Sequence, residues 1–167
     1  MSQSFTITEE DKRFMQMACD LACENVECGG GPFGAVIVKD GDVIAAAGNS
    51  VTLDNDPTAH AEVNAIRRAC SLLDSFQLDG CVIYCSSEPC PMCLGALYMA
   101  GVSRIYYGCS SAEADRFYFG DLAIDREFDK PHLERSTPCI HIEVTNALDA
   151  FNKWAIKKAN SNIKVIY

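Results

Sequence analysis

Residues 81–108, CVIYCSSEPCPMCLGALYMAGVSRIYYG, contain the pattern that decides the fold of this chain. The run Cys81–Cys85 is too apolar to alternate between two faces, so it predicts a strand that is buried on both sides. Pro91 is tolerated in the first turn of a helix, and the helix that it begins ends near Gly101. The run Arg104–Gly108 then predicts another strand. This alternation of strand and helix is typical of a sheet covered by helices.

The segments before this stretch predict two helices and a hairpin. Thr8 is followed by three acidic residues, as at many helix starts, and apolar residues at helical spacing continue the helix. Two apolar runs, 35–38 and 43–46, are joined by the turn sequence of residues 39–42, which predicts a β-hairpin. A polar loop then leads into a second helix over about 59–73.

The segments after it are less regular. The pattern predicts a fifth strand over Ile140–Val144 and a last helix over Leu148–Lys158. Residues 109–138 have the least regular pattern and are interpreted as a short helix and a loop. No linker or repeat divides the sequence, so a single domain over residues 1–167 is expected. Together these elements predict an α/β fold, a three-layer α/β/α sandwich with a mixed sheet of about five strands.

Composition and charge narrow the class of protein. Of the 167 residues, 49% are hydrophobic and 22% are charged, as in an ordinary folded domain. Fourteen Lys and Arg against 23 Asp and Glu leave a net charge of −9, which argues against a general nucleic-acid-binding surface. No run approaches the ~18 apolar residues of a membrane span, and the N-terminus has no signal-peptide pattern. A cytoplasmic location is therefore expected.

Ten cysteines are scattered through apolar stretches, and in a cytoplasmic chain most of them are expected to be reduced and buried. Only Cys90 and Cys93 have the Cys-x-x-Cys spacing that is typical of metal-binding or redox-active cysteines. At a helix start, such a pair can place two sulfurs on one side of the first turn, where free N–H groups and the helix dipole favour thiolates. His60 opens the other helix, and both starts are expected along one sheet edge. One imidazole and two thiolates predict one zinc ion per chain, with the fourth position left for water.

Glu62 lies two residues after His60 and is predicted to carry protons rather than to bind the metal. A carboxylate next to the attacking water can accept its proton and pass it to the substrate. Two interpretations stay open in which the chain is a redox protein or a structural zinc protein instead of a deaminase. A thioredoxin-like redox pair would explain the two cysteines but would leave residues 60–62 without a role. A structural zinc site would need a fourth Cys or His ligand at a second short spacing, and none is seen.

The pattern His-x-Glu followed by Pro-Cys-x-x-Cys is a signature of zinc-dependent nucleobase deaminases. From Gly31 to about Pro131 the chain resembles the cytidine and deoxycytidylate deaminase superfamily, and within it the bacterial guanine deaminases. The resemblance rests on three stretches: GPFGAVIVKDG (31–41), NDPTAHAE (55–62) and EPCPMCLGA (88–96). It implies a cytidine deaminase-like fold and a hydrolysis in which a nucleobase amine and water give a carbonyl group and ammonia. For guanine, the product would be xanthine.

The resemblance also implies roles for individual residues. Glu62 would move a proton to a ring nitrogen and help to expel ammonia. Asn49 would hydrogen-bond the base, Phe33 would line the pocket or stack on the base, and the backbone N–H of Ala61 would contact the ring. Asp121 would hydrogen-bond the base and assist proton transfer. Guanine offers N–H donors, and an ionised carboxylate can accept hydrogen bonds from them.

Plainer readings stay open for these binding residues. Asn49 lies in a loop, where Asn is frequent because its side chain stabilises turns. Phe33 can instead be a residue of the hydrophobic core. Asp121, taken without the resemblance, is interpreted as a solvated loop carboxylate. The stretch before Asp121 also departs from the pattern of guanine deaminases, which run through small residues into Gly-Phe-Asp-Asp. Here Phe117 and Tyr118 add bulk and Gly120 replaces an Asp. A reshaped pocket would leave cytosine or guanosine as alternative substrates.

Related classes of deaminase differ in the molecules that they bind. A tRNA adenosine deaminase would share the ligands and the proton carrier but would need a basic surface for RNA, so the net charge of −9 favours a small purine base. In related guanine deaminases the C-terminal segment crosses to a partner subunit and closes its active site. The resemblance thus implies a homodimer in which the tail, about 159–167, covers the partner's site and Tyr167 lies near the base. Disorder of these last residues is the simpler reading.

Overall fold

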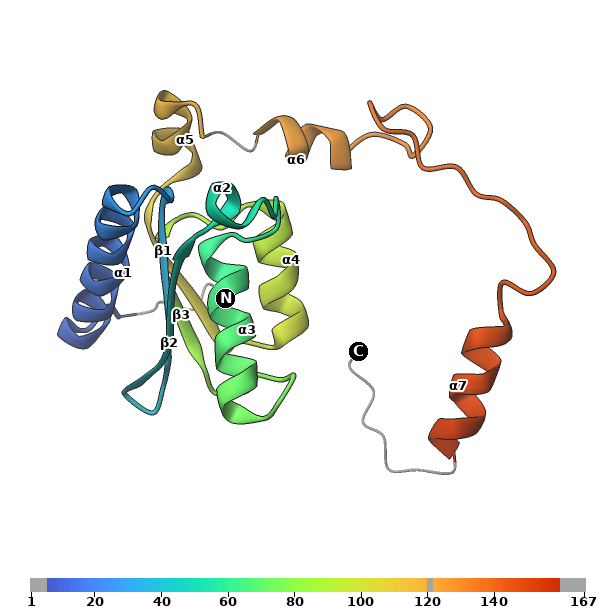
Figure 1. Cartoon of the computed structure of the whole chain (residues 1–167), viewed down its shortest axis with the longest axis horizontal. Helices are drawn as coiled ribbons and strands as arrows, with labels where there is room; N and C mark the ends of the chain where they lie inside the picture. The colour runs from blue at the N-terminus through green and yellow to red at the C-terminus, as the bar shows by residue number, and fades with distance from the viewer. Residues whose placement is uncertain (1–5, 120–121, 160–167) are drawn as a thin grey trace. The chain divides into compact units, whose positions relative to one another are not determined.

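The computed structural model describes residues 6–119 and 122–159 (Figure 1). Internal contacts divide the chain into two compact units, residues 1–122 and 123–167. The expectation of one domain over the whole chain stays a prediction. None of the described helices is both long enough and apolar enough to cross a membrane.

The first unit is built on a mixed sheet of four strands in the order β2-β1-β3-β4. β1 pairs antiparallel with β2 and with β3, whereas β3 pairs parallel with β4. The mixed sheet expected from the sequence is therefore confirmed. The strands are β1 Gly31–Lys39, β2 Asp42–Asn49, β3 Val82–Ser87 and β4 Arg104–Cys109.

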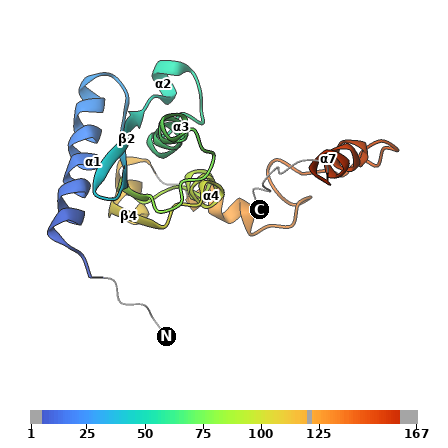
Figure 2. The same ribbon diagram turned by 90° about the horizontal axis from the view of Figure 1, so that it is seen from below.

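Helices cover both faces of this sheet and confirm the α/β/α sandwich. α1 lies on one face, and α3 and α4 lie side by side on the other (Figures 1 and 2). A single 3₁₀ turn, Asp115–Phe117, follows the last helix of the unit. The helices are α1 Glu9–Glu27, α2 Val51–Asp54, α3 Ala61–Leu73, α4 Pro91–Ala100 and α5 Ser111–Ala114.

Successive side chains of β1 pack into two different hydrophobic clusters, so the core has two layers. Val36 and Val38 pack in one buried cluster with Phe14 of α1, whereas Ile37 packs in the other cluster with Leu97 of α4. Successive side chains of a strand point to opposite faces, so a strand between two helical layers must be apolar at every position. This requirement explains the unbroken apolar runs in the sequence.

Local sequence signals explain the hairpin turn and the first helix start. Asp40 and Gly41 have φ angles of 51° and 86°, and a tight hairpin turn of type I′ needs positive φ at both central residues. At the start of α1, Thr8 Oγ1 accepts a hydrogen bond from the Asp11 N–H over 3.1 Å, while Asp11 Oδ2 accepts one from the Thr8 N–H over 2.8 Å. This reciprocal pair satisfies N–H groups that lack a partner inside the helix.

The second unit contradicts one prediction and confirms another. α6, Leu122–Phe128, begins at the boundary of the units, and α7, Asp149–Ala159, confirms the predicted last helix. The predicted strand over Ile140–Val144 is wrong, because these residues form no strand and are all exposed. The sheet consequently has four strands instead of about five. A strand needs a neighbour for its backbone hydrogen bonds, and this segment has none in the described part of the chain.

Candidate metal centre and active site

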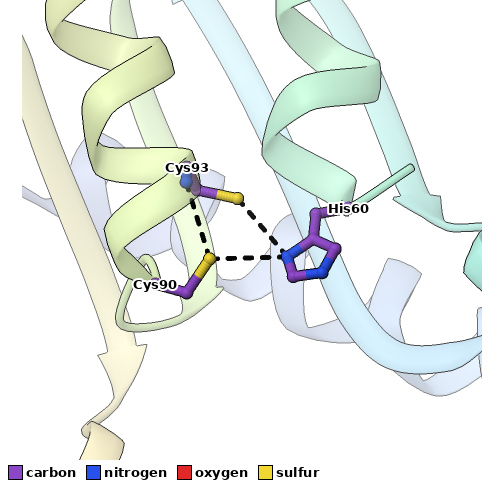
Figure 3. Close-up of side chains that lie close together, drawn as sticks. All are labelled: His60, Cys90 and Cys93. Carbon is purple, nitrogen blue, oxygen red and sulfur yellow. Dashed lines mark hydrogen bonds between the residues drawn. The ribbon is translucent and has the colours of Figure 1, made fainter. Parts of the chain in front are cut away.

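One nitrogen and two sulfur atoms from two helix starts converge in the first unit (Figure 3). His60 Nδ1 lies 3.6 Å from Cys90 Sγ and 3.5 Å from Cys93 Sγ. The three possible ligand atoms all lie within 4.8 Å of one another. The structure thus brings together the three residues that the sequence predicts to be zinc ligands.

The start of a helix places each of these residues. His60 directly precedes α3 and Cys90 directly precedes α4, both with extended backbone. Pro91 is well suited to follow Cys90, because the first turn of a helix leaves N–H groups unused and Pro lacks one. Cys93 lies in the first turn of α4, where its backbone N–H donates to Cys90 Sγ over 3.5 Å. The positive ends of the two helices therefore favour negative charge on the sulfurs.

The two thiols titrate as a pair. A hydrogen bond from the Cys93 thiol lowers the pKa of Cys90 to about 4. The same contact, together with burial, raises the pKa of Cys93. One proton is therefore lost readily and the other is held between the two sulfurs. A divalent cation can replace this proton, and two sulfurs with one imidazole nitrogen are a donor set that suits zinc. The residues present fit a zinc ion.

Glu62 is a buried carboxyl group beside this cluster. It lies in the first turn of α3, is only 8% exposed, and burial raises its pKa. It lines the same cavity as His60 and Cys90 but is not one of the three clustered ligands. A carboxyl group in this place can accept and return a proton within the cavity.

A cavity of about 720 Å³ contains the candidate site. Its wall includes His60, Glu62 and Cys90, and also Asn49 and Phe33, the two side chains that the sequence predicts to bind a base. A volume of this size is typical of sites for small molecules. The wall of one cavity therefore includes two of the three predicted metal ligands, the predicted proton carrier and two of the predicted binding side chains.

Asn49 is a buried polar residue at the end of β2. It is 7% exposed, and its Oδ1 accepts a hydrogen bond from the Val51 N–H over 3.2 Å. It also lies in the cavity wall, and its role in binding a base stays a prediction. Ala61, the first residue of α3, is fully buried, and the contact of its N–H with a base stays a prediction.

Sequence reasoning missed Phe119, which forms part of the cavity wall. Its ring meets the ring of Phe33 edge to face, with centroids 5.3 Å apart and planes at 85°. Both rings line the cavity. A signal for Phe119 was present, because it occupies the place of the Phe in the Gly-Phe-Asp-Asp pattern that the chain otherwise departs from.

Glu88 is a second cavity residue that the sequence did not reveal. Its Oε2 accepts hydrogen bonds from the backbone N–H and the hydroxyl of Ser111, each over 2.8 Å. These bonds lower the pKa of Glu88. The carboxylate thereby ties the segment before α4 to the start of α5, and α5 leads on to Phe119. No local pattern identifies this role, because the two partners lie far apart in the sequence.

Two predicted site residues, Asp121 and Tyr167, lie outside the described residues. Their roles in holding the base stay predictions.

Comparison with known proteins agrees with this geometry. The sequence profile of the family described as the cytidine and deoxycytidylate deaminase zinc-binding region matches residues 8–109. The chain is 51% identical over 142 residues to a guanine deaminase of Bacillus subtilis, which covers 84% of this chain and 91% of that protein. It is 33% identical over 150 residues to a tRNA-specific adenosine deaminase of Aquifex aeolicus, covering 90% of this chain and 96% of that protein.

Among solved structures too, a guanine deaminase is more similar to this chain than a tRNA deaminase is. The X-ray structure of guanine deaminase from Bacillus subtilis superposes with a TM-score of 0.88 at 46% identity, covering 96% of this chain and 100% of that one. A tRNA:A34 deaminase structure superposes with a TM-score of 0.61 at 37% identity, covering 77% of this chain and 96% of that one. With the profile match and the zinc-type cluster, these likenesses show that the chain belongs to the cytidine and deoxycytidylate deaminase family of zinc-binding enzymes.

Proposed function

We propose that this chain is a zinc-dependent guanine deaminase, which converts guanine and water into xanthine and ammonia. The observation that carries the proposal is one cavity that holds His60, Cys90 and the buried carboxyl group of Glu62. The similarity to guanine deaminases supports the choice of base, because it exceeds the similarity to the tRNA-specific enzyme.

Three residues would hold the zinc ion: His60, Cys90 and Cys93. Zinc, when bound, supplies Lewis acidity that makes water nucleophilic at neutral pH. Glu62 takes the proton from the attacking water, holds it on its carboxyl group and delivers it to the ring nitrogen next to the carbon that bears the amine. The second proton of the water, now on the hydroxyl group bound to the ring carbon, passes to the amine with the help of Glu62. The bond between carbon and nitrogen breaks, ammonia departs and a carbonyl group remains on the ring.

Asn49 and Phe33 would orient the base. The Asn49 Oδ1 is engaged by the Val51 N–H, which leaves the side-chain NH₂ to donate to an acceptor on the base. Phe33, supported edge to face by Phe119, offers an aromatic wall for a flat ring. Asp121 would accept from the N–H donors of guanine.

The test of the proposed substrate is ammonia release from a panel of guanine, guanosine, cytosine and adenine, together with inosine formation in tRNA. Guanine should exceed every other base in kcat/KM by on the order of 100-fold, because buried polar groups left unpaired by the wrong base disfavour its reaction. Metal-depleted protein is the control. A larger kcat/KM for another base, or efficient inosine formation, would refute the proposed substrate.

The same proposal includes a homodimer with exchanged C-terminal tails. Among the described residues β4 pairs only with β3, so one edge of the sheet is open to a further strand. On α4, the side chains of Tyr98 and Met99 are 78% and 57% exposed. Exposed apolar side chains of this size favour contact with another chain. The proposed location of the protein is the cytoplasm, a compartment in which cysteines stay reduced, and the ten free cysteines are compatible with it.

Light scattering should give a mass about twice that of one chain. A variant that ends at Ala159 and the Glu62→Gln variant should each lack activity, and mixing them should restore ammonia release. The restored site would combine Glu62 of the truncated chain with the tail of its partner. A dimer whose mixture stays inactive would rule out tail exchange, and a monomer would rule out the homodimer as well.

A further inference from the structure

The side chain of Asn25 joins the ends of two strands at the cavity. Asn25 lies in the last part of α1, and its Nδ2 donates to the carbonyl oxygens of Gly31 over 2.7 Å and of Asn49 over 2.8 Å. Gly31 and Asn49 face each other across β1 and β2, where the register shifts between Gly31 and Gly34. Strand pairing is irregular there, so the amide of Asn25 supplies a cross-link that the sheet itself does not complete.

Glycines leave a slot for this amide group. A Cβ atom at Gly30 would lie 2.4 Å from Asn25 Nδ2, and one at Gly48 would lie 2.2 Å from Asn25 Oδ1. Both distances are far shorter than van der Waals contact. The close approach of Asn25 to the two strand ends therefore requires residues without side chains at these positions.

A second amide holds the same strand end from the other face of the sheet. Asn64 of α3 donates from Nδ2 to the carbonyl oxygen of Gly48 over 3.1 Å and to Ser50 Oγ over 3.0 Å. The residues before and after Asn49 are thus bound by Asn64, while the carbonyl group of Asn49 itself is bound by Asn25. The two helices therefore hold three consecutive residues between them, Asn25 through the Asn49 carbonyl oxygen and Asn64 through the Gly48 carbonyl oxygen and the Ser50 hydroxyl.

We propose that Asn25 and Asn64 are positioning residues that form an amide clamp around Asn49 and set the place of its side chain in the cavity. The inference rests on the proposed function, in which Asn49 binds the base. A small displacement of a binding group weakens its hydrogen bond steeply, because such bonds depend on distance and angle. The two hydrogen bonds of the Asn25 amide involve neither a metal ligand nor Glu62, so its substitution should act on binding alone. Asn64 also donates to the carbonyl oxygen of Ala59 over 3.3 Å, directly before His60.

The test uses Asn25→Asp, which keeps the shape of the side chain but removes its two N–H donors and sets a carboxylate against two carbonyl oxygens. KM for guanine should rise about tenfold, the loss expected for one weakened hydrogen bond. The kcat value should stay within about twofold, and zinc content should not change. Asn146→Asp, an exposed substitution of the same chemistry, is the matched control and should leave KM unchanged. If Asn25→Asp does not fold, Asn64→Ala takes its place, and a rise in KM with unchanged zinc content then supports the clamp, whereas an unchanged KM refutes it.

A double-mutant cycle separates positioning from a merely structural role. In the Asn49→Ala background, Asn25→Asp should change KM by less than about twofold, since the group that it positions is gone. Fully multiplicative effects on KM would refute the clamp. A lower melting temperature of Asn25→Asp with an unchanged KM would also contradict the clamp, because Asn25 would then stabilise the fold without positioning Asn49.

Failure of the proposed substrate can be told apart from failure of the clamp. If another base in the panel reacts faster than guanine, the cycle is measured with that base, so the substrate proposal fails while the clamp is still tested. If Asn49→Ala leaves KM for the fastest base unchanged, Asn49 does not bind the base and the clamp proposal is wrong.

Discussion

The Glu62→Gln variant should keep its zinc and lose ammonia release by about 10³-fold, within the range that general acid–base catalysis contributes. The amide has nearly the same shape as the carboxyl group, so the buried first turn of α3 should stay intact. It cannot accept the proton of the attacking water or return it to the ring. Steady-state assays of ammonia release with metal analysis of the same samples measure both properties.

Glu24→Gln is the matched control for this experiment. Glu24 lies on the exposed side of α1, far along the chain from the metal ligands, and its substitution should change neither zinc content nor activity. Full activity of Glu62→Gln would remove this residue from the mechanism. Loss of zinc in the same variant would show that Glu62 helps to hold the metal.

The Cys90→Ser variant should bind zinc about 100-fold more weakly or worse, and should lose activity in proportion. A serine hydroxyl is not deprotonated near neutral pH, whereas the pKa of Cys90 is lowered to about 4 by its hydrogen bond with Cys93. The site would then offer one thiolate and one imidazole in place of three strong ligands. Zinc content after dialysis against a chelator of known affinity measures the change.

Cys23→Ser provides the matched control, because Cys23 is an exposed free thiol of α1. It should retain zinc and activity. Undiminished zinc in Cys90→Ser would contradict the ligand assignment, and zinc loss in both variants would point to general instability of cysteine substitutions. Circular dichroism of each variant separates the loss of metal from the loss of fold.

Sequence patterns predicted the mixed sheet, the hairpin and the three zinc ligands because these depend on short-range chemistry. Asp40 and Gly41 allow the positive φ angles of a tight turn wherever they occur. Cys90 and Cys93 are three residues apart, and the first turn of any helix places such residues on one side. The strand at Ile140–Val144 was predicted in the same way and is wrong. Alternating apolar residues show only that a segment can pair, and pairing also needs a neighbouring strand.

The sequence by itself therefore determined the class of fold, the starts of the longer helices α1, α3, α4 and α7, and the chemistry of the metal site, since periodicity and ligand type are local properties. Only the tertiary structure decided how Asn25 and Asn64 hold Asn49, and how Phe119 supports Phe33. Glu88 joins Ser111 in the same manner, 23 residues away along the chain. Such contacts depend on how layers of the sandwich pack, and no short stretch of sequence contains both partners.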